Sequence, residues 1–120
     1  MSGCVFCRIV AGTEPAEVVA DWVDALAIVP LKQYARGHVI VMPRAHVENF
    51  VVEPIITGMV MARAAEITGH LRLHPANLIT SAGREATQDV DHLHVHVLPR
   101  RANDGLALPW YSGKSKRVAA

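Results

Sequence analysis

The spacing of apolar positions predicts one long helix in the middle of the chain. After Pro54, apolar residues recur every three or four positions, which is the period of a single helical face. The members of this stripe are Ile56, Val60, Ala64, Ile67 and Leu71, and Met59 widens it. Proline is favoured in the first turn of a helix, so the helix is expected to begin at Pro54. Pro75 is expected to end it.

Short runs of β-branched and apolar residues, separated by turn-forming residues, predict the strands. These predicted strands cover residues 17–21, 25–29, 38–42, 77–80 and 92–98. The segments 30–37 and 83–91 have the composition of loops, and residues 4–11 are expected to form a short helix that ends at Gly12. Strands grouped around one central helix predict an α+β domain with a mainly antiparallel sheet.

The length and composition fit a single domain without an obvious macromolecular partner. The 120 residues predict one domain over 1–120, with a core at about 4–100 and a tail at 101–120. A net charge of +1 argues against a general nucleic-acid binder. No apolar run reaches the roughly 18 residues of a membrane span, and no signal peptide opens the chain. We therefore expect a cytoplasmic protein that binds neither membrane nor nucleic acid.

The segment His92-Leu93-His94-Val95-His96 carries the strongest chemical signal. Strict alternation in a strand places the three imidazoles on one face and the apolar residues on the other. Histidine titrates near neutrality and is also a competent nucleophile, so such a row can attack phosphorus or move protons. The spacing alone leaves two alternatives open, a three-histidine metal site and a set of surface histidines.

Cys4 and Cys7 are the only cysteines, and they stand three residues apart. In a cytosolic protein such a pair indicates a metal site or a redox pair rather than a structural disulfide. A structural zinc needs four ligands, so the pair would supply half of them. A thioredoxin-like redox motif would follow a strand, and none is predicted here. Two reduced, unliganded thiols remain an alternative.

Several segments together resemble the histidine-triad family of nucleotide hydrolases and transferases. The run His-Leu-His-Val-His-Val-Leu-Pro-Arg at 92–100 resembles the signature of that family. Residues 4–12 resemble its amino terminus, residues 37–46 resemble its central hairpin, and Gln88 stands four residues before His92, where many members have glutamine. The resemblance spans about residues 4–100 in the expected order. Its most specific part is the triple histidine with the Pro-Arg end.

The resemblance implies a two-step reaction at a nucleotide α-phosphorus. The middle histidine, His94, would attack and form a nucleotidyl-histidine intermediate, which water or another acceptor would then release. In the family a backbone carbonyl holds the proton on the other ring nitrogen of this residue. His38 and His96 would donate hydrogen bonds to phosphate oxygens, and Gln88 would touch the bridging or leaving oxygen. The expected substrates are nucleotide phosphoramidates or dinucleoside polyphosphates.

Likeness to the zinc-containing branch of the family implies a structural zinc ion and a twofold homodimer. The ligands would be Cys4, Cys7, His46 and His92. No catalytic cofactor is expected. Trp110 and Tyr111 would cover the nucleotide site, pack across the dimer interface, or pack within one subunit.

Two positions depart from the family pattern. Pro30 stands where many members have an Asp or Asn that holds the ribose hydroxyls, and proline offers neither a side-chain acceptor nor an N–H. Asp89 stands where Ser or Thr is usual, and its carboxylate would repel a phosphate unless it turns away or pairs with a base such as Arg84 or Arg100. These departures favour an alternative function, a nucleotide-binding module of the same fold with little turnover. A metalloenzyme with all three histidines on one ion is a further alternative.

Overall fold

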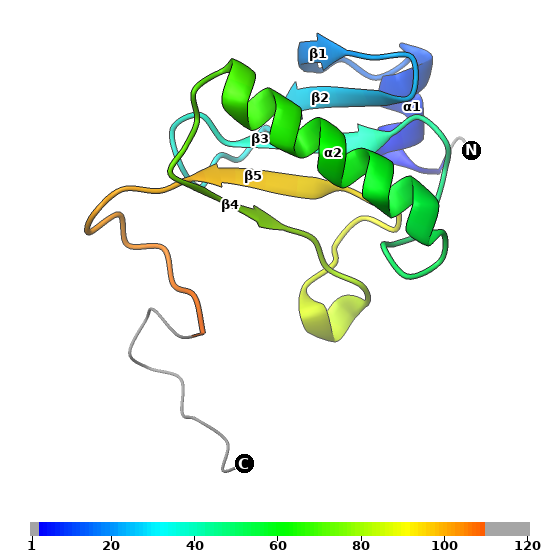
Figure 1. The fold of residues 1–120 in the computed structure, drawn as a ribbon. Coiled ribbons are helices and arrows are strands. Elements are labelled where there is room, and N and C mark those ends of the chain that lie inside the picture. The colour runs from blue at the N-terminus through cyan, green and yellow to red at the C-terminus, as the bar shows by residue number, and fades with distance from the viewer. Residues whose placement is uncertain (1–2, 110–120) are drawn as a thin grey trace.

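The computed structural model describes residues 3–109, which are built around one sheet (Figure 1). Its five strands lie in the order β1-β2-β3-β5-β4, and every neighbouring pair is antiparallel. The strands are β1 (Glu17–Asp21), β2 (Ala25–Val29), β3 (Val39–Pro43), β4 (Ala76–Ile79) and β5 (Val95–Pro99). The predicted α+β architecture with an antiparallel sheet is thereby confirmed.

The long helix α2 (Pro54–His70) lies across one face of the sheet (Figure 1). Val60, Ala64 and Ile67 of the predicted stripe are buried, and they form one cluster with inward-facing residues of the central strands. The prediction for the end of the helix is wrong. The helix stops at His70, and Leu71 is its C-cap with 39% of its surface exposed.

A left-handed residue, not Pro75, turns the chain out of α2. Arg72 has φ of 55°, its N–H donates to the carbonyl of Gly69, and the N–H of Leu73 donates to the carbonyl of Thr68. This pair of bonds is a Schellman motif, which satisfies the last carbonyls of a helix without any proline. The motif usually has glycine at the left-handed position, so an arginine there does not indicate it.

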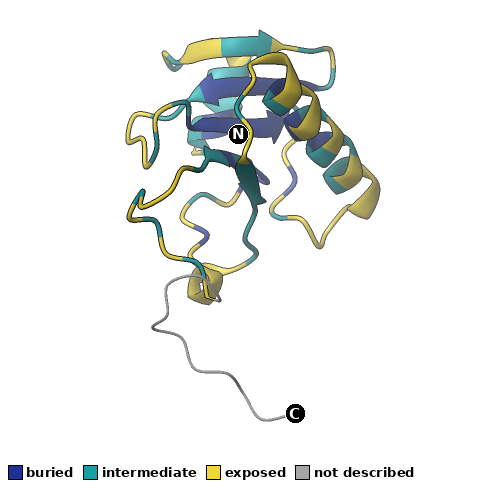
Figure 2. Ribbon diagram, turned by 60° about the vertical axis from the view of Figure 1, so that its left-hand side comes forward, coloured by how far each residue is buried: buried dark blue, intermediate teal, exposed yellow. Residues whose placement is uncertain are grey.

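The short helix α1 (Val5–Ala11) packs against the opposite face of the sheet and ends at Gly12, whose φ is 81°. Phe6 forms a second buried cluster there, together with Leu26, Ile28, Ile40 and Met42. The central strands are therefore covered on both faces, which explains why β2 and β3 are apolar without alternation. Figure 2 shows this distribution, with buried residues concentrated in the central strands and exposed ones on the outer side of α2.

The last strand is shorter than predicted, because β5 begins at Val95 rather than at His92. Its pairing with β3 reaches only the pair Val41 and Val95. Beyond that point the ladder is replaced by other bonds: the Leu93 N–H donates to the Val47 carbonyl at 2.6 Å, and His92 Nε2 contacts the Pro43 carbonyl at 2.9 Å. The first two histidines thus lie in an irregular segment that leads into the strand.

Two smaller differences concern the remaining strands and the loop before β5. β3 and β4 are each shifted by one residue from the predicted ranges, and the loop at 83–91 contains one turn of 3-10 helix, η1 (Arg84–Ala86). None of the helices within residues 3–109 combines the length and hydropathy that crossing a membrane requires.

Candidate active site

His94 is held in a recess with one ring nitrogen fixed by the backbone. Only 7% of its surface is exposed, and its Nδ1 lies 2.7 Å from the carbonyl oxygen of His92. A carbonyl can only accept, so Nδ1 carries the proton and the neutral ring has its lone pair on Nε2. The Thr80 hydroxyl donates to the His94 carbonyl at 2.7 Å, which anchors the same residue to the end of β4. The ring therefore presents a nucleophilic nitrogen in a fixed position.

A chain of hydrogen bonds sets the tautomer of His96. The backbone N–H of Tyr34 donates to Nδ1 of His38 at 3.2 Å, which leaves the ring proton of neutral His38 on Nε2. That Nε2 lies 2.9 Å from Nδ1 of His96, so Nδ1 accepts and the proton of His96 is on its Nε2. The rings of His94 and His96 are 5.1 Å apart between centroids. His96 thus keeps one N–H, on Nε2, that is not used by the His38 contact.

Burial keeps these two histidines uncharged near neutral pH. Desolvation, together with the neighbouring His94 and His38, lowers the pKa of His96 to about 4. Desolvation also lowers the pKa of His38. Because His38 uses both ring nitrogens within the protein, in this arrangement it orients His96 rather than offering a hydrogen of its own. Its predicted direct bond to a phosphate stays a prediction.

A cavity of about 540 Å³ is lined by two neighbours of His94, Phe6 and Asp89, although His94 itself is not among the lining residues. Its apolar walls include Phe6, whose ring meets the His94 ring edge-on with centroids 5.0 Å apart. Asp89 also lines the cavity, and one of its carboxylate oxygens lies 4.0 Å from Nε2 of His94. The volume is in the range of small-molecule sites and suits a nucleoside. Pro30 lines the cavity too. Many family members have an Asp or Asn at this position that holds the ribose hydroxyls, and proline has no such acceptor.

Gln88 is buried, and its side-chain amide is engaged within its own loop. Its Oε1 accepts from the Gly83 N–H at 2.8 Å. Its Nε2 donates to the carbonyls of Glu48 at 2.7 Å and Val90 at 3.0 Å. These bonds hold the segment 83–90, which includes Asp89, against the loop that connects β3 to α2. The predicted contact between Gln88 and a leaving oxygen stays a prediction.

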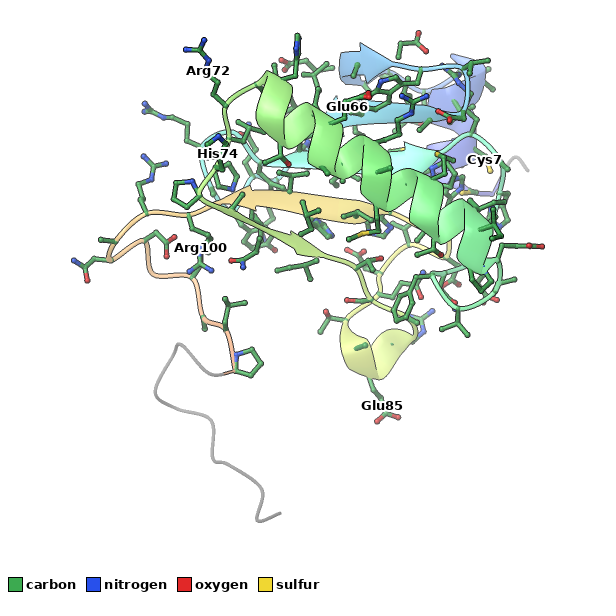
Figure 3. The ribbon with its side chains drawn as sticks, in the orientation of Figure 1. Cys7, Glu66, Arg72, His74, Glu85 and Arg100 are labelled. Carbon is green, nitrogen blue, oxygen red and sulfur yellow. The ribbon has the colours of Figure 1, made fainter. Side chains whose placement is uncertain are left out.

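Four metal-ligating side chains converge where α1 meets the end of β3. The ligand atoms of this cluster all lie within 4.8 Å of one another. The cluster consists of Cys4, Cys7, His46 and His92. Figure 3 shows Cys7 at this end of the sheet.

The distances within the cluster suit a tetrahedral ion. Sγ of Cys7 lies 3.2 Å from Nδ1 of His46, and Sγ of Cys4 lies 3.4 Å from Nδ1 of His92. Zinc bonds of about 2.3 Å to sulfur and 2.0 Å to nitrogen give tetrahedral edges of roughly 3.5 Å. The contact of His92 Nε2 with the Pro43 carbonyl places the ring proton there and frees Nδ1 as a ligand. The residues therefore fit a closed structural zinc site.

The triad does not form a single metal site. Within residues 3–109, the group able to hold a metal takes only His92 from the triad. The rings of His94 and His96 lie together, while the ring of His92 meets that of His46 at 5.0 Å between centroids. This separation removes the support for a metalloenzyme with all three imidazoles on one ion.

Neither arginine considered as a partner of Asp89 has an ion pair with it in the described part of the chain. Arg100 instead binds Asp104 at 2.8 Å and the side chain of Asn77 at 2.8 Å. These bonds tie the start of the tail to the end of β5 and to β4. Trp110 and Tyr111 lie outside the described residues.

Sequence reasoning missed three groups that shape the site. Thr80 and the backbone N–H of Tyr34 each fix a histidine, and Phe6 places its ring against His94. Phe6 had a weak signal, as the one aromatic residue between the two cysteines. The other two contacts depend on the backbone conformation just before β3 and just after β4, which no pattern of residue types indicates.

The family follows from comparison with known proteins. The model of the HIT domain family matches residues 11–103. The chain belongs to the HIT, or histidine-triad, family. An uncharacterised HIT-like protein of Mycobacterium tuberculosis is 37% identical over 113 residues, which are 88% of this chain and 76% of that protein.

Two further relatives carry more informative names. Adenosine 5'-monophosphoramidase hnt1 of Schizosaccharomyces pombe is 28% identical over 111 residues, which cover 91% of this chain and 84% of that protein. A crystal structure of a zinc-bound histidine-triad family protein from Mycobacterium smegmatis has a TM-score of 0.80 and 34% identity. The match covers 88% of this chain and 81% of that one.

Proposed function

We propose that this HIT protein is a nucleotidyl hydrolase or transferase with His94 as its nucleophile. The observation that carries the proposal is the fixed tautomer of this ring, with Nδ1 bonded to the His92 carbonyl and Nε2 lying 4.0 Å from Asp89, which lines a nucleoside-sized cavity. A nucleophile must be unprotonated at the attacking atom, and this arrangement supplies that state without any further base. The yeast relatives named adenosine 5'-monophosphoramidase support a nucleotide phosphoramidate as substrate.

The proposed reaction has two displacements at the α-phosphorus. In the first, Nε2 of His94 forms a bond to phosphorus, and the bond from phosphorus to the leaving atom breaks with its electron pair. For a phosphoramidate the leaving nitrogen takes a proton from solvent and departs as an amine. In the second, water adds to phosphorus and loses a proton, the bond to Nε2 breaks, and the nucleotide is released. Another acceptor in place of water would make the reaction a transfer.

The neighbouring histidines are assigned to the phosphate. The N–H on Nε2 of His96 is oriented by the bond from His38, and a preorganised donor stabilises the charge that develops on phosphate oxygens. Both rings are neutral at pH 7, so they act as hydrogen-bond donors and orienting groups rather than as fixed cations. Gln88 would act by holding the loop that borders the site, and also by touching the leaving oxygen if the amide turns.

A structural zinc is the proposed cofactor. The converging cysteines and histidines fit it, and the zinc-bound relative from Mycobacterium smegmatis supports it. The ligands, Cys4, Cys7, His46 and His92, would leave no open coordination position, so the ion would stabilise the fold and take no part in the reaction. It would also fix His92, whose carbonyl orients the nucleophile. A twofold homodimer and a cytoplasmic location stay predictions.

A nucleotide-binding module with little turnover is the alternative, and one observation favours it. The cavity is lined by Pro30 and Asp89, the two residues that depart from the family pattern. Such a module would bind a nucleoside monophosphate at the same cavity but would release no product.

The test is steady-state turnover of an adenosine phosphoramidate by purified protein and its variants. His94→Ala should lower kcat by at least about 10³-fold, because removing a nucleophile leaves only binding and positioning. His96→Ala should lower it by about 10²-fold, since one donor is lost and the nucleophile stays. His70→Ala, at the exposed end of α2, serves as control and should be unaffected. Near-normal turnover by His94→Ala refutes the mechanism, and nucleotide binding without turnover by the unaltered protein supports the alternative.

A further inference from the structure

Asp89 places a carboxylate next to the attacking nitrogen of the proposed site. Its Oδ1 lies 4.0 Å from Nε2 of His94, and its side chain is 85% exposed. Reacting atoms in a near-attack complex are about 3–3.5 Å apart. Phosphorus poised at Nε2 would therefore bring its oxygens close to this carboxylate, and the leaving atom, in line on the far side of phosphorus, would still lie within roughly the Debye length of about 8–10 Å. The negative charge of Asp89 therefore changes the electrostatic potential at the reacting phosphate and its leaving group.

No positive charge offsets this carboxylate in the described structure. His94 is its only ion-pair partner within residues 3–109, and that contact counts only when the ring is protonated. The residues that line the adjacent cavity include Glu14, Glu17 and Asp89, with no lysine or arginine among them. Glu14 is paired with Arg8 at 3.1 Å, so part of this negative charge is neutralised from outside the lining.

The groups assigned to the phosphate do not supply a cation either. His38 and His96 form a neutral hydrogen-bonded pair. A leaving group with several phosphates would bring further negative charges toward Asp89, and it would meet no fixed positive charge there. A leaving group with a positive charge would be attracted by the same carboxylate.

We propose that Asp89 selects substrates by the charge of the leaving group, favouring nucleotide phosphoramidates of cationic amines and opposing anionic leaving groups. The inference rests on the proposed function, because it concerns the leaving group of that same reaction. It assigns Asp89 a role in specificity and leaves the nucleophile and the phosphate donor unchanged. The carboxylate acts by its charge through space, and it neither gives nor takes a proton in the reaction.

The exposure of the side chain sets the expected size of the effect. A pair of solvent-exposed unit charges a few ångströms apart changes a rate or binding constant by about three- to fivefold. Replacing a cationic leaving group by an anionic one reverses the sign of the interaction. The ratio of kcat/KM for the two substrates should therefore depend on Asp89 by about tenfold.

The experiment compares two adenosine 5'-phosphoramidates of equal length. In one the amine carries a second, terminal ammonium group, and in the other it carries a terminal carboxylate. We measure kcat/KM for both with the full chain, with Asp89→Asn, and with Glu85→Gln as a charge-matched control. Asn keeps the shape of Asp and removes the charge. Glu85 lies in the same loop and points away from the sheet in Figure 3.

Asp89→Asn should lower the cation-to-anion ratio by about tenfold, partly by raising kcat/KM for the anionic substrate. Glu85→Gln should leave the ratio unchanged. The preference of the unaltered protein should also shrink as ionic strength rises, since exposed charges are screened over about 8–10 Å at physiological salt. A structural role of Asp89 would instead lower both kcat/KM values together and leave the ratio and its salt dependence unchanged.

The outcomes separate this inference from the proposed function. If both substrates are cleaved through His94 but Asp89→Asn leaves the ratio unchanged, the role of Asp89 is refuted while the proposed function stands. If the unaltered protein cleaves neither substrate, the proposed function is refuted and the inference is refuted with it.

Discussion

The lowered pKa of His96 predicts that the protein loses stability when the pH falls from 7 to 5. Desolvation and the neighbouring histidines hold the pKa of this ring at about 4 in the folded state, against 6.5 for an unperturbed histidine. Between these values the unfolded chain binds a proton that the folded chain does not bind. Stability therefore rises with pH in this window, and it is lost as the pH falls below about 6.5.

The size of the effect follows from the two pKa values. With 6.5 in the unfolded and about 4 in the folded state, the linkage relation gives a loss of about 2 kcal/mol between pH 7 and pH 5. This is a large part of the 5–15 kcal/mol that a small domain commonly has. Burial of His38 and His92 lowers their pKa values too, so the total loss should exceed the share of His96 alone.

Urea unfolding at pH 7 and pH 5 isolates the contribution of His96. The unaltered protein is compared with His96→Asn, which keeps a polar side chain but cannot titrate. Every other titrating group, including the cysteines and histidines of the metal cluster, is present in both proteins. The contribution of these groups to the pH-dependent change in the free energy of unfolding therefore largely cancels in the comparison. The free energy of unfolding should fall by about 2 kcal/mol more for the unaltered protein than for the variant. Equal losses in the two proteins would show that His96 is not held neutral by burial.

Three further outcomes are expected. Ile67→Ala should lower the free energy of unfolding by about 3 kcal/mol in urea unfolding, because Ile67 is 2% exposed on the inner face of α2. Ile55→Ala, at an 85% exposed position of the same helix, should change it by under about 0.5 kcal/mol. Elemental analysis should find one zinc per chain, and removal of the zinc by a chelator or by Cys7→Ser should lower Tm. A zinc content near zero, with both thiols titratable in the native protein, would refute the metal site. Gln88→Ala should speed hydrogen exchange in the segment 83–90, because its amide bonds hold that loop, and unchanged protection would contradict this role.

The features that the sequence predicted correctly are those set by residues close together in the chain. The ranges of β1 and β2 are as predicted, because turn residues bound each of these strands. Most of the stripe on α2 is confirmed, since Val60, Ala64 and Ile67 are buried in one cluster with Ile56 and Met59 packed against it, but Leu71 lies beyond the helix and is exposed. Both patterns follow from the geometry of a single element, which a sequence displays directly.

The differences arise where distant segments meet. The alternation of His92 and His94 is that of a strand, but the pairing of β3 with β5 stops at Val41 and Val95, so these residues lie outside the ladder. Their bonds go instead to the carbonyls of Pro43 and His92. The end of α2 is a different, local case, because it depends on a left-handed conformation at Arg72, which a non-glycine residue does not favour.

For the site, the chemical identity of the residues was more predictable than their arrangement. The metal cluster and the histidines were expected from the family resemblance, and the structure brings Cys4, Cys7, His46 and His92 together. The carbonyl that holds the ring proton of His94 was expected from the resemblance, whereas the tautomers of His38 and His96 were not predictable, because the backbone N–H of Tyr34 sets them. Nor was the orientation of Asp89, which faces His94 although an arginine partner was considered for it.

The central claim is that His94 becomes covalently attached to the nucleotide. The most direct measurement mixes the protein with an adenosine phosphoramidate, quenches within milliseconds in strong base with denaturant, and locates added adenylate by peptide mass spectrometry. The quench is basic because a bond between phosphorus and an imidazole nitrogen hydrolyses more slowly in base than in acid. The account predicts adenylate on the peptide that contains His94, on that residue alone, and none in His94→Ala. Adenylate on another residue, or full turnover without any adduct at the earliest times, would contradict the account.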